Sequence, residues 1–508
     1  MRFSTWVSVF AMAGVAVAAA SRPAAAAAGD NCVKVLGYEW SGEKQSMDPA
    51  DMHSGDDAYH IFAVYNRLVD VDDNFKVLPE LATEWSASPD NLTWTFKLRH
   101  GVKFHSGKDF TSADVVYTFK RMLDPALGSG AQAVLEFLDS DGIKAPDPYT
   151  VTFTTKKPVV ELPVLISNKF TNIVPDGAKH ADLVLHEDGT GPFMQDQFTP
   201  NAPVRILKKN PNYWDAGKPK ADCLRITVAQ EAVAAVSAIK AGQVDLVLNV
   251  DPSVISALKD DPNVQLLQTA ASNSMTIAMW VDTKPWDDNR VREALKLSVD
   301  RQAMVDTVLL GFGETGADSP VPIPNPASYT KEAPKQDIAK AKALLAEAGY
   351  PNGLKFDMYT AEGVPGMTKM AQVFAEMAKP AGFDINVIVT PAESYWDNTW
   401  LKKPFLTSAW SMRPPGEGLA VAYTQNAKWP ETHWKRPDYD AMLLKANTTA
   451  DPAERNKLYQ QTGELLAKEG GEIIPMFVHQ VLALRKGCSG YTPRAQNFNL
   501  NFEDISCQ

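Results

Sequence analysis

The chain contains 508 residues, which is more than a single domain usually holds and allows about two or three domains. Hydrophobic residues make up 45% of it and charged residues 22%, close to the globular average, which argues against both extensive disorder and a polytopic membrane protein. The formal net charge is −11. Because an acidic surface repels phosphate backbones, we expect no nucleic-acid partner.

The amino terminus has the order of a secretory signal peptide. Arg2 gives a positive start, residues 6–20 are apolar, and Ala26 to Ala28 supply the small residues that signal peptidase reads. A membrane anchor needs about 20 apolar residues, whereas this run has about 15 before it meets Arg22. We therefore expect residues 1–28 to be cleaved and the rest of the chain to be exported.

Four cysteines lie beyond the signal, and none forms a C-x-x-C pair, so zinc and thioredoxin-like interpretations are weak. An even number of cysteines in an exported chain favours two disulfides, with three possible connectivities. We predict Cys32–Cys223, which joins the starts of two expected strands, and Cys488–Cys507, which closes a short carboxy-terminal segment.

In chain order, the first expected elements are a short strand at 33–36 and a half-buried strand at 92–98, where apolar and polar residues alternate. Thr111 and Asp114 form a capping-box pattern ahead of an amphipathic helix. Another alternating strand follows at 149–153.

Two βαβ units follow, and such units predict parallel strands in an α/β sheet. Their strands and helices are expected at 224–228, 231–241 and 244–248, and at 354–359, 367–378 and 385–389. Further helices are expected at 291–310, 338–348 and 452–468, the last behind the N-cap Asp451.

Signatures of catalysis and cofactor binding are missing from the sequence. It has no G-x-S-x-G, H-E-x-x-H or G-x-x-x-x-G-K-[ST] motif, and its histidines lack metal-binding spacing. Residues 311–316 match G-x-G-x-x-G, but they follow an expected helix and precede a proline-rich loop, so we interpret them as a helix stop. We expect no enzyme, cofactor or metal site; a secreted α/β hydrolase is the least favoured alternative.

Ordered sequence blocks along nearly the whole mature chain carry a family resemblance. They are Ser46-Met47-Asp48-Pro49, Leu78 to Ala82 with Trp85, Trp94 to Val116, Gly189 to Phe193, Asn210 to Trp214, Ala241 to Asp245, Asp288 to Arg301, and Ala341 to Pro351. In this order they resemble the extracytoplasmic solute-binding proteins of ABC transporters, in the family that includes dipeptide, oligopeptide and nickel binders.

The resemblance implies an α/β fold of the periplasmic-binding-protein type, with two lobes joined by two crossing hinge strands. Lobe I is expected at 29–57, 187–273 and 483–508, with an inserted subdomain at 58–186, and lobe II at 274–482. The implied mechanism is hinge closure around a solute that is then delivered to a membrane permease and its ATPase subunits. We expect a monomer, and the resemblance implies a place in the periplasm of a Gram-negative bacterium.

One departure from the family's peptide-binding pattern bears on the ligand. In peptide-binding relatives a strand ends in a Trp, and an Asp three residues later pairs with the ligand's ammonium group. Here Trp410 matches the Trp, but Arg413 stands at the second position. A guanidinium prefers carboxylate or phosphate, so we predict a ligand with an anionic group. The alternative is that Arg413 pairs with Glu417 and shapes its loop.

Other candidates for ligand binding come from position in the chain. Tyr38, Glu39 and Trp40 follow the first strand, Glu362 follows the strand at 354–359, and Tyr395 belongs to a group of aromatic residues. Core packing is the alternative for the aromatic residues. The expected solute is peptide-like or another small polar organic molecule; carriers of a metal complex, haem, an opine or a sugar conjugate are the alternatives.

Overall fold

The computed structural model describes residues 31–37, 46–52, 55–197, 204–228, 232–362, 364–495 and 500–508. The predicted signal peptide and the candidates Tyr38, Glu39 and Trp40 lie outside these residues. Within the described ranges, no helix has the length and apolar character that crossing a membrane requires.

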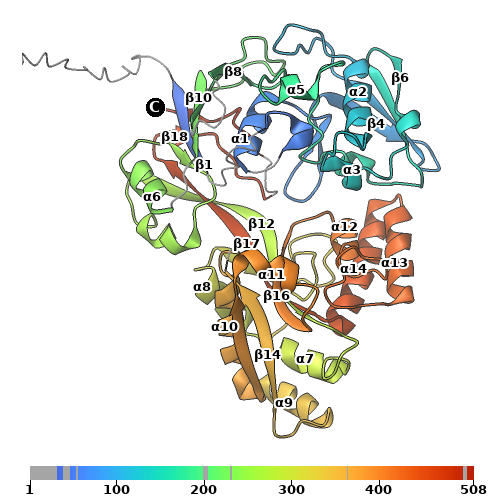
Figure 1. Cartoon of the computed structure of the whole chain (residues 1–508), viewed down its shortest axis with the longest axis vertical. Helices are drawn as coiled ribbons and strands as arrows, with labels where there is room; N and C mark the ends of the chain where they lie inside the picture. The colour runs from blue at the N-terminus through green and yellow to red at the C-terminus, as the bar shows by residue number, and fades with distance from the viewer. Residues whose placement is uncertain are drawn as a thin grey trace, which may run out of the picture. The chain divides into compact units, whose positions relative to one another are not determined.

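The largest sheet has the strand order β15-β14-β16-β12-β17-β11-β1-β10-β9-β8, and β13 pairs with β17 off this path. Its two long central strands, β12 (Val264–Met279) and β17 (Glu472–Arg485), run antiparallel side by side (Figure 1). On one side of them lie β16 (Phe405–Ser411), β14 (Leu354–Ala361) and β15 (Phe383–Thr390). On the other side lie β11 (Leu246–Val247), β1 (Cys32–Gly37), β10 (Cys223–Val228), β9 (Val204–Lys209) and β8 (Phe193–Gln197).

The first predicted βαβ unit is present as β10, α6 (Ala232–Lys240) and β11. Both strands run parallel to β1, which lies between them. Cys32 and Cys223 are register partners in the β1–β10 pair and are disulfide-bonded, which confirms that predicted bridge.

The second predicted βαβ unit is β14, α10 (Met367–Ala378) and β15, with the two strands parallel throughout. The buried face of α10 repeats at helical spacing through Met370, Ala371 and Phe374, and it packs into one core with Met358 of β14. Their spacing of three and four positions places these apolar residues on one side of the helix, toward the core.

The prediction of a single helix at 291–310 is wrong, because the segment forms two helices. These are α7 (Asn289–Leu297) and α8 (Arg301–Val308). Asp300 adopts an extended backbone and its side chain accepts a hydrogen bond from the Ala303 amide at 3.0 Å. An Asp in this position caps a new helix rather than continuing an old one. Beyond α8, Gly311 has φ +84°, as a helix stop requires, and residues Gly313–Thr315 form the short strand β13.

The segment expected to be an inserted subdomain has its own sheet, in the order β4-β5-β7-β6. These strands are Ala82–Ala87, Thr93–Leu98, Thr150–Thr154 and Lys144–Asp147, respectively. The sheet is covered by α2 (Ser112–Leu123), which begins at the predicted Thr111–Asp114 capping box. Phe96, Phe119 and Phe153 lie in a core of their own here, as an independent subdomain requires. The exact lobe boundaries stay a prediction.

A group of helices packs together near the end of the chain: α12 (Pro415–Ala420), α13 (Pro437–Thr448) and α14 (Pro452–Glu469). The predicted N-cap Asp451 accepts from the Glu454 amide at 2.8 Å at the start of α14. The other elements are η2 (Pro49–Asp51), α1 (Gly55–Val64), β2 (Val69–Val71), β3 (Val77–Pro79), α3 (Ala131–Val134), η3 (Ser140–Gly142), α4 (Leu162–Leu165), α5 (His180–Leu183), η4 (Pro252–Ala257), α9 (Ile338–Glu347), η5 (Lys379–Ala381), α11 (Ala392–Asn398), β18 (Cys488–Ser489) and β19 (Ser506–Cys507).

Candidate functional site

The pairing of β12 with β17 is interrupted where the two strands pass from one half of the sheet to the other. The register shifts between Gln268 and Ala271 and again before Asn273. Side-chain hydroxyls replace the missing ladder bonds: Thr269 Oγ1 accepts from the Gln480 amide at 2.9 Å, and Ser272 Oγ donates to the Val478 carbonyl at 3.0 Å. Register irregularities bend strands and re-aim side chains, so the interruption leaves space beside the two strands.

A cavity of about 230 Å³ lies at this interruption. Its lining comes from both long strands, from α1, from the chain around 248–250, from the end of α8, from the loop after β14 and from the carboxy-terminal segment. The lining residues are Tyr59, Leu248, Asn249, Val250, Ile255, Ser272, Asn273, Met275, Leu309, Phe312, Val364, Pro365, Ala409, Val478, His479, Gln480, Val481, Leu482, Tyr491, Arg494 and Leu500.

The charge of this lining is opposite to that of the whole chain. Among the lining residues that the structure describes, the ionisable side chains are two tyrosines, His479 and Arg494, and none is an Asp or Glu. The His479 ring lies 3.4 Å from Gln268 Oε1 on one side and 3.7 Å from Glu314 on the other. Burial raises the pKa of Tyr491 well above its usual value, and the neighbouring Arg494 lowers it. A neutral phenol and a cationic guanidinium therefore share this wall.

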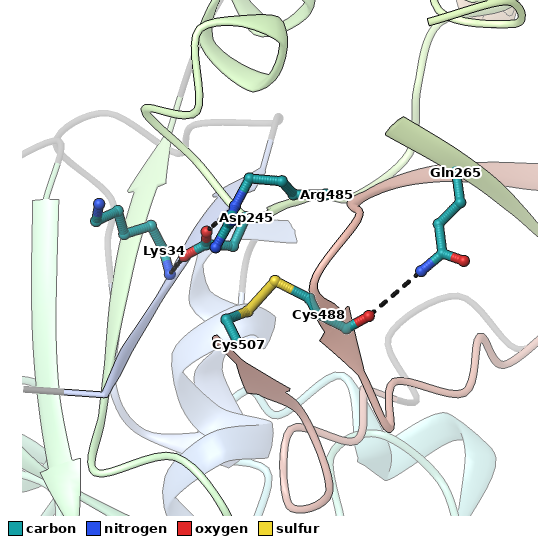
Figure 2. Close-up of a disulfide and its surroundings, with 6 residues drawn as sticks. All are labelled: Lys34, Asp245, Gln265, Arg485, Cys488 and Cys507. Atoms are coloured by element: carbon teal, nitrogen blue, oxygen red, sulfur yellow. Dashed lines mark hydrogen bonds and ion pairs between the residues drawn. A yellow bond between two sulfur atoms is a disulfide. The ribbon is translucent and has the colours of Figure 1, made fainter. Parts of the chain in front are cut away.

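The carboxy-terminal segment that carries Tyr491 and Arg494 is fixed by the second disulfide. Cys488 and Cys507 are register partners in the β18–β19 pair and are bonded, as predicted. Figure 2 shows this bridge beside Asp245, which accepts from the Lys34 amide at 2.9 Å and from Arg485 Nε at 2.7 Å. These contacts tie β1, β11 and β17 together next to the bridge, so the segment starts from a rigid base.

Trp410, which the family resemblance marked as a candidate, lies with three other tryptophans around a buried carboxylate. Glu431 is fully buried, and it accepts from Trp410 Nε1 at 2.6 Å and from Trp400 Nε1 at 2.8 Å. Burial raises the pKa of Glu431. Trp396 and Trp429 flank this pair, with ring centroids 5.5 Å from Trp400 and 5.8 Å from Trp410. We call these four indoles with Glu431 the tryptophan cluster.

The remaining predicted site residues lie apart from the cavity lining. Tyr395 is fully buried and its hydroxyl donates to the Thr407 carbonyl at 2.6 Å, as its core-packing alternative expects. Arg413 donates to Glu417 at 2.9 Å and its guanidinium lies 5.5 Å from the Trp410 ring, so the ion pair of the alternative interpretation is present. Glu362 is exposed just after β14. The solute contacts predicted for these residues stay predictions.

Sequence reasoning missed Arg494 and His479. His479 lies inside a strand predicted by no local pattern, and Arg494 follows Pro493 in an irregular stretch. Only the long-range folding of the carboxy-terminal segment brings Arg494 into the same cavity lining as Ser272 and Asn273. No signal in the sequence marks such a position.

Comparison with known proteins fits this arrangement. Residues 76–430 match the family described as bacterial extracellular solute-binding proteins, family 5, middle part. The chain belongs to this family. As a family 5 solute-binding protein it is the solute-capturing component of an ABC importer, and it has the two-lobed α/β fold of these proteins.

Two curated proteins are similar to this chain over most of its length. Di/tripeptide-binding protein 1 of Pseudomonas aeruginosa is 30% identical over 86% of this chain and 87% of its own. Heme-binding protein A of Haemophilus influenzae is 30% identical over 86% of this chain and 84% of its own.

Solved structures extend the likeness to the fold. HbpA2 from Haemophilus parasuis has a TM-score of 0.83 at 25% identity, covering 94% of this chain and 100% of the other. AgaA of A. tumefaciens R10, solved with agropinic acid, has a TM-score of 0.73 at 25% identity and covers 94% and 99%.

Proposed function

We propose that this solute-binding protein captures a compact, peptide-like or other polar organic solute that bears an anionic group, in the cavity beside β12 and β17. The observation that carries the proposal is the lining itself, whose described residues include an arginine and a histidine but no acidic residue, in a chain of net charge −11. Inside a cavity with few waters, such a local positive charge attracts an anion more strongly than the distant acidic surface repels it.

The position of the cavity supports capture by hinge closure. β12 and β17 enter the hydrophobic cores on both sides of the register interruption, through Met275 and Met476 at one end and Leu482 and Leu484 at the other. A bend at the interruption moves the core that contains Met275 and Met476 relative to the core that contains Leu482 and Leu484, while the packing inside each core is kept. A solute that contacts both sets favours the closed arrangement by its differential affinity.

The ligands named for similar proteins define the alternatives. They include di- and tripeptides, haem, glutathione, agropinic acid and a nickel–histidine complex. A cavity of about 230 Å³ is slightly below the usual ~300–1,000 Å³ of ligand pockets, which favours a compact solute over a porphyrin. The described part of the lining holds one imidazole and no carboxylate, which favours an organic anion over a metal cation. An opine with a free acid group shares the favoured chemistry.

Transport without chemical change completes the proposal. The protein works as a monomer in the periplasm, releases the solute unaltered to a membrane permease with its ATPase subunits, and catalyses no reaction. Arg413 stays a second candidate for an anion contact, from its place beside Trp410, where it lines a small hollow with Ser274 and Tyr423.

Retention of solute from a broad pool tests the proposal. The full mature chain is incubated with a yeast-extract ultrafiltrate, separated from free solutes by gel filtration, and denatured, and the released molecules are identified by mass spectrometry. We expect a small acidic organic solute, in an amount equal to the protein, with the same mass as in the pool. Release of haem or a metal complex, retention of nothing, or a mass change in the solute would each overturn it.

A further inference from the structure

Arg494 differs from most arginines of this chain in having no acidic partner. Arg121, Arg301 and Arg413 each contact a carboxylate. Arg494 lines the cavity, its Nε atom is buried without a hydrogen bond, and no acidic side chain among the described residues forms an ion pair with it.

An unpartnered guanidinium nitrogen in a cavity wall is unfavourable in the empty protein. Burial removes its water, and without a new acceptor the desolvation is uncompensated. The best acceptor for a guanidinium is a carboxylate, which meets two N–H groups at once. The described lining residues supply no carboxylate, and their polar side chains include amides and hydroxyls, such as Asn249 and Ser272, as neutral acceptors.

The backbone around Arg494 is held firmly, so the side chain is presented from a fixed point. The amide of the next residue, Ala495, donates to Asp73 Oδ1 at 2.8 Å, in the turn between β2 and β3. Tyr491 and Phe502 are buried with ring centroids 6.0 Å apart, on either side of Arg494 in the chain. The Cys488–Cys507 disulfide closes the same segment. Fixed donors bind with less loss of conformational entropy than mobile ones.

We propose that Arg494 is the residue that recognises the solute's carboxylate. The inference rests on the proposed function and assigns its anion specificity to one side chain. The solute places its acid group on the guanidinium of the carboxy-terminal segment, and its remaining part lies along Ser272 and Asn273 of β12 and against the cavity's apolar residues. A carboxylate is favoured over phosphate because a single arginine provides the site.

The test compares Arg494→Ala and Arg494→Lys with the wild type and with Arg225→Ala, an exposed arginine on β10 outside the cavity lining that matches the change in charge. Each protein is given the yeast-extract ultrafiltrate, untreated or with its carboxylates methyl-esterified. We expect Arg494→Ala to retain about 10- to 100-fold less solute, since a charge-assisted pair contributes roughly that much to affinity. Arg494→Lys retains an intermediate amount, and Arg225→Ala retains as much as the wild type. Esterification removes retention by the wild type.

Thermal unfolding without solute separates recognition from a structural role. If Arg494 acts only toward the solute, Arg494→Ala melts at or above the wild-type temperature, because the substitution removes an unsatisfied buried donor. A lower melting temperature would assign it a structural role and overturn the inference. Equal retention by Arg494→Ala and wild type would also overturn it and leave the proposed function intact, whereas retention of nothing by the wild type would overturn the proposed function itself.

Discussion

The tryptophan cluster and the carboxy-terminal wall of the cavity, which comprises Tyr491, Arg494 and Leu500, hold their charged groups in opposite ways. In the tryptophan cluster, Glu431 is buried but receives two indole hydrogen bonds, and the nearby Arg413 is paired with Glu417. In the carboxy-terminal wall, Arg494 has a buried nitrogen with no acceptor. Satisfied polar groups fix the shape of a site, whereas an unsatisfied one in a cavity indicates where a ligand completes the bonding.

The largest effect is expected from removing the disulfides, because they constrain the unfolded chain. Replacing Cys488 and Cys507 together by Ser should destabilise the protein by about 3 kcal/mol, and replacing Cys32 and Cys223 by about 5 kcal/mol, since the Cys32–Cys223 bridge closes a much longer loop. Solute binding is then compared at a temperature at which both variants stay folded. It should fall only in the Cys488/Cys507 variant, because that change frees the carboxy-terminal wall. Chemical denaturation and solute retention measure the two effects; equal loss of binding in both variants would contradict the assignment.

The tryptophan cluster is tested by replacing Glu431. Glu431→Ala leaves the N–H groups of Trp400 and Trp410 without acceptors, so we expect a loss of about 2–5 kcal/mol in the free energy of unfolding. Glu431→Gln keeps one acceptor and should lose less. The control is Glu417→Ala, whose exposed ion pair contributes about 1 kcal/mol or less. A fully stable Glu431→Ala would show that the cluster does not depend on these bonds.

A second buried carboxyl, that of Glu472, makes the stability of the protein dependent on pH. Glu472, in β17, accepts a hydrogen bond from the Tyr423 hydroxyl, and burial raises its pKa to about 8. In the unfolded chain the Glu472 carboxyl loses its proton near a pKa of about 4.3, whereas in the folded chain it keeps the proton until about pH 8. The contribution of this carboxyl to the free energy of unfolding is therefore lost as pH rises through about 8. Glu472→Gln cannot ionise. Its stability relative to the wild type should therefore increase from about pH 5 to about pH 8.

Lys296 acts in a different pH window. Its amino group donates to the Ala467 and Gly470 carbonyls, and burial lowers its pKa to about 8. Above that pH the unfolded chain keeps a proton that the folded chain has lost, up to the ordinary lysine value of about 10.4, so stability rises with pH there. Denaturation curves confined to about pH 5–8 isolate Glu472, and a stability difference independent of pH in that range would exclude its raised pKa.

Local patterns predicted the scaffold far better than the site. The α10 helix and the Asp451 cap follow from spacing and composition within short stretches, the Cys32–Cys223 bridge was predicted from the starts of two expected strands, and all three are present. The helix break at Asp300 was missed because apolar residues keep their helical spacing past Asp300, although Asp is also a residue that caps helices. The cavity depends on a register shift between strands about 200 residues apart in sequence, which no local pattern specifies.

The smallest effect is expected at Arg413, the residue that the sequence favoured most. Its guanidinium already has Glu417 as an acceptor and lies over Trp410, with both partners part-exposed, so Arg413→Ala should change the free energy of unfolding by about 1 kcal/mol or less. If the anion contact belongs to Arg494 alone, this variant keeps wild-type solute retention. If both arginines contact the solute, Arg413→Ala loses affinity too, and the Arg413→Ala/Arg494→Ala double variant loses more than either single variant. Calorimetry with the solute recovered from the wild type distinguishes the two results. To bind an anion, Arg413 must break its hydrogen bond to Glu417, whereas the buried Nε of Arg494 has no hydrogen bond to break.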